Sequence, residues 1–268
     1  CVDGRIAFVG GINVIDDMET PGQVPPRYDY AIQVEGPLVG PIREAAARLW
    51  RWIAWASVKE RWPARRNLRA DYAPAGNQRA AFVVRDNVRH RADIEDAYLA
   101  AIEAARSEIV IANAYFFPGR RFRRALAAAA RRGVAVTLLL QGRVEYLLLH
   151  YASRALYGSL LQAGVEIHEY HKSFLHAKVA VIDGHWATVG SSNIDPFSLL
   201  LAREANVVVD DRKFAGELRL SLHEAMEGGA LAVRSHWLRL SFWSRLPIWL
   251  CYGLVRLLMG VFGYGGRH

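Results

Sequence analysis

Apolar and polar positions along the chain form blocks that switch between a period of two and a period near 3.6. Short alternating or continuous apolar runs predict strands, and longer runs with one apolar face predict helices. The predicted strands lie within residues 3–13, 28–36, 80–86, 108–116, 134–142, 165–170, 176–195 and 204–211. The predicted helices cover residues 41–62, 92–107, 120–133, 146–164 and 212–226. Strands that alternate with helices in this way predict an α/β fold in which helices cover a mixed sheet.

Composition divides the chain into four parts. Residues 63–79 are polar, basic and without period, which predicts a linker between two lobes. We expect residues 1–62 to be the remainder of a first lobe and residues 80–227 to be a second lobe. Residues 228–268 are rich in tryptophan, leucine and arginine, which favours a helix that lies in the plane of a membrane surface. A core-packing helix hairpin is the alternative for this tail.

The net charge of the 268-residue chain is +8, which suits an anionic partner such as nucleic acid, acidic lipid headgroups or phosphate esters. The two cysteines, Cys1 and Cys251, make a disulfide framework improbable and fit a reducing compartment. The chain begins with cysteine and not methionine, so we expect it to be a fragment that starts inside a domain.

The stretch HAKVAVIDGHWATVGSSNID, residues 176–195, carries the clearest chemical signal. The dipeptide Asp183-Gly184 between two β-prone runs predicts a hairpin with a two-residue turn. With that turn Ile182 faces His185, and alternate residues share a face. Four polar side chains then project from one side of the hairpin: His176, Lys178, Ser191 and Asn193. The other side holds packing residues: Ala177, Val179, Val181, Trp186 and Thr188.

These four polar groups are suited to binding and cleaving a phosphate ester. Lys178 and the amide of Asn193 can donate hydrogen bonds to phosphate oxygens, and Ser191 can add a third. His176 can attack phosphorus or pass a proton to an ester oxygen. Asp183 lies in the turn, where we expect it chiefly to shape the turn and to pair with a nearby donor.

The start of the chain, CVDGRIAFVGGINVIDD, repeats part of this stretch at an offset of 180 residues. The equivalent positions are Asp3, Gly10, Gly11 and Asn13, and we expect Asn13 to bind phosphate as Asn193 does. A matching His and Lys would lie five and three residues before Cys1, outside this chain. We therefore expect the first motif to be incomplete here because the chain begins too late.

An acidic residue opens the strand that follows each motif, Asp29 in the first copy and Glu204 in the second. Such a carboxylate could accept the Nδ1–H of a motif histidine and fix its tautomer. The alternative is a solvated acid at the end of a strand.

The pattern His176-x-Lys178-x₄-Asp183, followed by Gly190-Ser191-x-Asn193, resembles the HKD signature of the phospholipase D superfamily. The resemblance implies two pseudo-symmetric lobes, each a mixed sheet flanked by helices, with one active site between them and the first lobe incomplete here. It implies a phosphohistidine intermediate formed on one histidine while the other protonates the leaving alcohol. It places His176, Lys178 and Asp183 in the catalytic set, with His176 as the general acid and base. From the repeat we expect Glu204 to belong to the same set.

Beyond the motif, the stretches HWATVGSSNIDPFSLLLAREANVVVDDRKF and YDYAIQVEGP resemble bacterial cardiolipin synthases of the B type. That group implies phosphatidyl transfer from phosphatidylglycerol to a second phosphatidylglycerol, without a cofactor or metal. It also implies an anionic membrane surface as partner, at the cytoplasmic side of the bacterial inner membrane. With half of the motif missing, we expect the chain to be inactive alone.

Three other functions remain open at this point. One is a phosphodiesterase of the same superfamily that acts on nucleic acid, which the net charge would allow. Another is hydrolysis of phospholipid, because the motif does not decide whether water or an alcohol accepts the phosphatidyl group. The third is a lipid-binding protein without catalysis.

Overall fold

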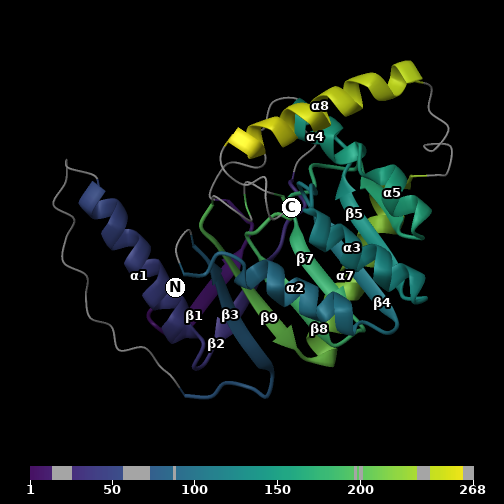
Figure 1. The fold of residues 1–268 in the computed structure, drawn as a ribbon. Helices are drawn as coiled ribbons and strands as arrows, with labels where there is room; N and C mark the ends of the chain where they lie inside the picture. Colours follow the sequence, from purple (N-terminus) through teal and green to yellow (C-terminus); the bar gives the residue numbers. More distant parts are fainter. Residues whose placement is uncertain are drawn as a thin grey trace.

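An eight-stranded mixed sheet lies at the centre of the protein (Figure 1). The computed structural model describes residues 1–13, 26–56, 73–86, 89–195, 198, 202–233 and 242–261. The strands follow one another across the sheet in the order β10-β6-β5-β4-β7-β8-β9-β3. Their bounds are β3 Arg79–Arg85, β4 Glu108–Asn113, β5 Ala135–Gln141, β6 Glu166–Tyr170, β7 Lys178–Ile182, β8 Trp186–Gly190, β9 Glu204–Asp210 and β10 Ala230–Ala232. The β4–β5 and β5–β6 pairs are parallel and the other pairs are antiparallel, as expected for a mixed sheet.

Helices cover both faces of this sheet, so its central strands are buried on both sides. One face packs against α2, α3, α4, α5 and α8, and the other against α7. The helix bounds are α1 Val39–Ala56, α2 Asp93–Ala104, α3 Arg120–Arg131, α4 Leu147–Arg154, α5 Tyr157–Gln162, α7 Arg212–Gly229 and α8 Phe242–Val261. In Figure 1 α8 lies along α4 at one end of the molecule, and α1 projects away from the sheet.

A second, two-stranded sheet packs on the same face as α7. It consists of β1, Ile6–Gly10, and β2, Ala31–Glu35, which run antiparallel. Ala7 and Val9 of β1 and Ile32 of β2 enter one core cluster with residues of β7, β8 and β9. This packing brings the first-copy motif against the strands that carry the second copy.

The register of the β7–β8 hairpin differs from the expected one by one residue. Ile182 pairs with Trp186 and not with His185. Asp183 and Gly184 both have positive φ, 52° and 64°, and His185 is an additional loop residue, so the loop is three residues long. The shift also moves Trp186, which packs in the α2–α3 core with Ala180 and Ile182 and not on the side of Val179 and Val181.

Other boundaries differ from expectation in smaller ways. The helix expected over 146–164 is two helices, α4 and α5. The tail expected to begin at residue 228 starts inside α7, and β10 then joins the sheet beside β6. Most of the expected linker, residues 63–72, lies outside the described residues, as do residues 234–241 and 262–268 of the tail. Within the described part, no helix combines the length and apolar character needed to cross a bilayer.

Candidate active site

The segment before β2 and the segment before β7 run side by side, although they are almost 150 residues apart in the sequence. The backbone N–H of His176 donates to the carbonyl of Tyr28 at 2.8 Å, and Tyr28 donates to Phe174 at 2.8 Å. Tyr28 and Leu175 form a parallel bridge. Backbone pairing thus places the first-copy residue Asp29 beside the second-copy residue His176.

The imidazole of His176 contacts the carboxylate of Asp29. Nδ1 of His176 lies 2.6 Å from Oδ2 of Asp29, and the two side chains are 14% and 7% exposed. A carboxylate can only accept, so Nδ1 carries the proton and donates. In the neutral ring Nε2 then keeps its lone pair and is the nitrogen available for proton transfer or attack.

Lys178 lies directly against this pair. Its Nζ donates to the backbone carbonyl of His176 and is 2.9 Å from Nδ1. Nδ1 already donates to Asp29, so the second contact is a close approach of two donors and not a hydrogen bond. Burial lowers the pKa of Lys178 to about 8, against the nearby carboxylates of Asp29, Glu204 and Glu145, which favour its charge.

Glu204 does not contact His176; its hydrogen-bond partner is Ser191. Ser191 Oγ donates to Oε2 of Glu204 at 2.5 Å and accepts from the backbone N–H of Ala205 at 3.1 Å. Burial raises the pKa of Glu204 to about 7, with the charge of Asp195 adding to the effect and the Ser191 bond opposing it. The acid that orients the second-copy histidine therefore comes from the first copy.

Asp183 holds the hairpin turn to the start of β4. Its carboxylate accepts from the backbone N–H groups of Arg106, Ser107 and Glu108 at 2.8–3.0 Å and from the Ser107 hydroxyl at 2.7 Å. Burial alone would raise the pKa of Asp183, but these hydrogen bonds hold it at about 2. None of these contacts involves His176, so they support the turn-shaping role and not the catalytic role that the signature implied.

The expected phosphate ligands are only partly placed around the pair. Ser191 is committed to Glu204, as described above. Asn193 donates through Nδ2 to the Ser198 hydroxyl at 3.5 Å, and its buried Oδ1 has no hydrogen-bond partner in the described part of the chain. Asn13 is exposed. Phosphate binding by these three residues stays a prediction.

Glycines of both motifs allow close approach. A Cβ at Gly10 would lie 2.3 Å from the carbonyl oxygen of Tyr30, and one at Gly190 would lie 2.1 Å from Oδ1 of Asn206. A Cβ at Gly11 would lie 2.7 and 2.8 Å from the two oxygens of Asp29 and 3.0 Å from Nζ of Lys178. Gly11 is therefore part of the wall behind the His176–Asp29 pair.

A second group of polar residues near Lys178 has no signature in the sequence. Arg27 Nη2 lies 3.3 Å from Oε1 of Glu145, and the Tyr115 hydroxyl donates to Oε2 of Glu145. Arg27 and Glu145 both influence the charge of Lys178. Arg27 precedes β2 and Glu145 follows β5, so no local pattern connects them.

Three comparisons with known proteins bear on this site. Residues 98–225 match the family model described as "Cardiolipin synthase, PLD-like domain". The chain is 39% identical over its full length to cardiolipin synthase B of Salmonella typhi, and it spans 64% of that relative. Its fold is similar to that of Nuc of Salmonella typhimurium, a phospholipase D family member, with 22% identity and a TM-score of 0.50 over 59% of this chain and all of that one.

A second solved structure agrees with the first. The phosphatidylserine synthase of Haemophilus influenzae matches 69% of this chain and 47% of its own with a TM-score of 0.55 and 11% identity, which concerns the fold alone. In fold, motif and these matches the chain is similar to proteins of the phospholipase D superfamily. Among these proteins the chain is similar to the B-type cardiolipin synthases, of whose length it spans 64%.

Proposed function

We propose that this chain provides the second-copy half of a phosphatidyl-transfer site that makes cardiolipin from phosphatidylglycerol through a phosphohistidine intermediate. The observation that carries the proposal is the 2.6 Å contact between His176 and Asp29, which joins the two motif copies. The 39% identity to a cardiolipin synthase B supports the choice of reaction within the superfamily.

In the proposed mechanism His176 is the general acid and base. With Asp29 on Nδ1, protonated Nε2 donates its proton to the glycerol oxygen as the phosphorus–oxygen bond breaks. The phosphatidyl group then resides on the counterpart histidine of the first copy, whose position would precede Cys1. In the second step Nε2 takes the proton from the hydroxyl of the acceptor phosphatidylglycerol as that oxygen attacks phosphorus and the phosphorus–nitrogen bond to the counterpart histidine breaks.

Lys178 is proposed to offset the negative charge of the phosphodiester. Its ammonium is buried beside the imidazole, where a charge acts more strongly than in water. A pKa near 8 still leaves most of the side chain protonated at neutral pH. Electrostatic support of this kind lowers the barrier only if the charge is already in place, which its contact with the His176 carbonyl ensures.

We also propose that α1 and α8 contact an anionic membrane surface. Trp55 of α1 is 80% exposed, and Trp243 of α8 is 77% exposed. Exposed leucines accompany the tryptophans on α8, and Arg48 and Arg51 accompany them on α1. Aromatic rings beside arginines suit the headgroup level of an anionic bilayer.

Vesicle co-sedimentation tests the membrane proposal. Trp55→Glu and Trp249→Glu should each reduce binding to vesicles of phosphatidylglycerol and phosphatidylcholine. Leu220→Glu is the control, because Leu220 is an exposed apolar residue on α7. Equal losses in all three variants would contradict a specific α1 and α8 contact.

The reaction is tested with the complete reading frame that encodes this chain, supplied with labelled phosphatidylglycerol in vesicles. His176→Ala should reduce the rate of cardiolipin formation, followed by thin-layer chromatography, by about 10²–10⁴-fold or more. His185→Ala is the matched control, because this exposed histidine of the same hairpin also contacts a carboxylate, Asp210, at 2.9 Å. Cardiolipin formation that survives in His176→Ala would refute the mechanism. Cleavage of DNA with no lipid product would favour the nuclease.

A further inference from the structure

Asp29 lies between two tyrosines, Tyr28 and Tyr30, that contact each other. In extended backbone alternate residues share a side, so the two tyrosines project to the side opposite to Asp29. Their hydroxyl oxygens are 2.6 Å apart, and their rings meet edge to face with centroids 5.4 Å apart. One short segment therefore carries the acid that contacts His176 on one side and two hydroxyl groups on the other.

Ser221 of α7 joins the two tyrosines. Its Oγ lies 2.9 Å from the hydroxyl oxygen of Tyr30 and 3.2 Å from that of Tyr28. Tyr28 also donates to the backbone carbonyl of Ser221 at 3.2 Å. With that bond in place, Tyr30 can donate to Tyr28 and Ser221 can donate to Tyr30, so each of the three protons has an acceptor. We call these three residues the hydroxyl cluster.

The hydroxyl cluster is partly buried, which keeps its groups neutral. Burial raises the pKa of Tyr30 above its ordinary value, although the hydrogen bond to Ser221 opposes the rise. Tyr30 therefore remains a hydrogen-bond donor at physiological pH. Because water has limited access to these groups, a hydrogen bond lost from the cluster is not freely replaced by one to water.

The helix that carries the cluster serine also supports the second-copy hairpin. Leu218 and Leu222 of α7 belong to one core cluster with Val179 and Val181 of β7. The strand β7 begins with Lys178. The hydroxyl cluster therefore connects the segment of Asp29 to the helix that packs behind the hairpin of the active site.

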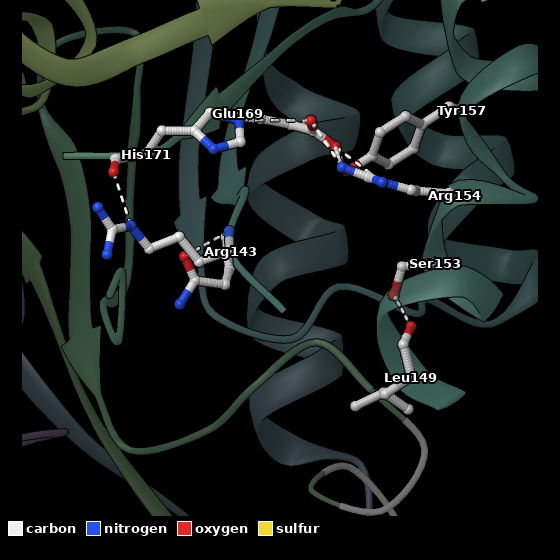
Figure 2. A network of polar contacts seen from close by, with 8 residues as sticks. Arg143, Leu149, Ser153, Arg154, Tyr157, Glu169 and His171 are labelled. Atoms are coloured by element: carbon white, nitrogen blue, oxygen red, sulfur yellow. Dashed lines mark hydrogen bonds and ion pairs between the residues drawn. The ribbon is translucent and has the colours of Figure 1, made fainter. Parts of the chain in front are cut away.

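Tyr170 of β6 packs against the ring of Tyr28. The two centroids are 5.3 Å apart, and Tyr170 is buried. The neighbouring residue Glu169 faces the other side of β6, where it accepts from Arg154 at 2.9 and 3.0 Å and from the Tyr157 hydroxyl at 3.1 Å (Figure 2). The ring of Tyr28 thus packs against a strand that is itself held from its opposite face.

The backbone of Tyr30 orients the carboxylate of Asp29. The N–H of Tyr30 donates to Oδ1 of Asp29 at 2.8 Å, while Oδ2 contacts Nδ1 of His176 at 2.6 Å. These two contacts, one on each oxygen, set the plane of the carboxylate. Whatever fixes Tyr30 therefore also fixes the donor on which the orientation of Asp29 depends.

We propose that Tyr28, Tyr30 and Ser221 are positioning residues, whose hydroxyl cluster holds the carboxylate of Asp29 against Nδ1 of His176. This inference rests on the proposed function and adds the groups that keep its orienting acid in place. Backbone bonds to the segment before β7 fix the edge of the Asp29 segment. The hydroxyl cluster fixes its opposite side, so Asp29 has little freedom to turn away from the imidazole.

The test follows the Nδ1 proton of His176 by NMR in the chain labelled with nitrogen-15 at its histidine rings. In the unmodified chain the contact with Asp29 should protect this proton from exchange with water. Tyr30→Phe and Ser221→Ala each remove hydroxyl bonds and should speed the exchange about three- to tenfold, the effect of one neutral hydrogen bond on an opening equilibrium. Ser221→Thr keeps a hydroxyl and should restore slow exchange.

Two controls separate positioning from stability. Tyr98→Phe makes the same chemical change at a buried hydroxyl that has no hydrogen-bond partner in the described part of the chain. Asp211→Ala removes the N-cap bond to Phe214 at 2.8 Å, so it weakens α7 without touching the hydroxyl cluster. Both variants should keep the slow exchange of the unmodified chain.

The same variants in the complete reading frame give a kinetic signature. Tyr30→Phe and Ser221→Ala should lower the maximal rate of cardiolipin formation about three- to tenfold. The apparent Michaelis constant for phosphatidylglycerol should stay unchanged, because the cluster acts through Asp29 and not on the substrate.

Exchange that stays slow in both Tyr30→Phe and Ser221→Ala, or that becomes equally fast in Asp211→Ala, would overturn the proposal. Failure of the proposed function is a separate result. The complete reading frame would then make no cardiolipin, while the Nδ1 proton of His176 would still respond to Tyr30→Phe and Ser221→Ala.

Discussion

The first and second motif copies can be compared position by position, because their backbones follow the same path. Asp3 and Gly4 turn the first with φ of 49° and 72°, and Asp183 and Gly184 turn the second with 52° and 64°. β1 pairs with β2 as β8 pairs with β9, and Gly10 faces Ala31 where Gly190 faces Asn206. The shared phrase in the sequence thus corresponds to a shared backbone.

The copies differ at the residue after this glycine, which is Gly11 in the first copy and Ser191 in the second. In the second copy the Ser191 hydroxyl occupies the space beside the strand-opening acid and binds Glu204. In the first copy Gly11 has no side chain, so the Asp29 carboxylate occupies that space and contacts His176 beside Lys178. A single missing side chain therefore allows the acid of one copy to serve the histidine of the other. The symmetric contact would join Glu204 to the first-copy histidine.

The largest effect is expected when the crossing contact is removed. Asp29→Asn replaces an acceptor-only carboxylate with an amide that no longer fixes the tautomer of His176, so transfer should fall by about 10²–10⁴-fold. Asp210→Asn is the matched control, because Asp210 contacts the exposed His185. The rate of cardiolipin formation by the complete reading frame measures both. Equal rates in the two variants would show that the crossing contact has no catalytic role.

The second largest effect on the transfer rate is expected when a side chain is added at Gly11 of the first copy. Gly11→Ala would place a Cβ within 2.8 Å of both Asp29 oxygens, so the carboxylate must move away from His176. A misplaced orienting group should lower the transfer rate about 10- to 100-fold. Gly216→Ala is the control, because a Cβ there meets nothing within 4 Å. Full activity in Gly11→Ala would mean that the asymmetry between the copies is incidental.

The buried charge of Lys178 should lower stability while it serves the reaction. Burial lowers its pKa to about 8, so the charged form costs folding free energy below that pH, and the cost vanishes above the unfolded pKa near 10.4. Lys178→Met should raise the free energy of unfolding by about 1–3 kcal/mol at pH 7 and by less at pH 10. Urea denaturation at both pH values measures this. The exposed Lys213→Met should change little, and a destabilised Lys178→Met would contradict the argument.

The smallest expected effect is a difference in stability between variants of the two Asp-Gly turns. Asp183→Asn loses the charge on an acceptor of four hydrogen bonds and should cost about 1–2 kcal/mol, whereas Asn at the exposed Asp3 should cost less than about 0.5 kcal/mol. Because the pKa of Asp183 is lowered to about 2, its contribution is complete above about pH 4 and is lost as pH falls toward 2. Acid unfolding of the two variants tests this, and identical curves would count against it.

Local patterns in the sequence predicted the α/β fold, the order of the elements and the Asp-Gly turn, because periodicity and turn chemistry are local. The predicted register of β7–β8 was wrong because the extra loop residue, His185, depends on a tertiary hydrogen bond. Its carbonyl accepts from the N–H of Asp211 at 2.9 Å. The role of an acid beside the motif histidine was predicted, but its exchange between copies depends on how the segment before β2 pairs with the segment before β7. Arg27 and Glu145 follow no motif, and only the fold brings them together near Lys178.

The central claim is that Asp29 of the first copy, and not Glu204 of the second, holds Nδ1 of His176. Nitrogen-15 NMR of the ring measures it directly in this chain. We predict a protonated, hydrogen-bonded Nδ1 that is lost in Asp29→Ala and retained in Glu204→Gln. A His176 signal that is unchanged in Asp29→Ala, or that is lost in Glu204→Gln alone, would contradict the account.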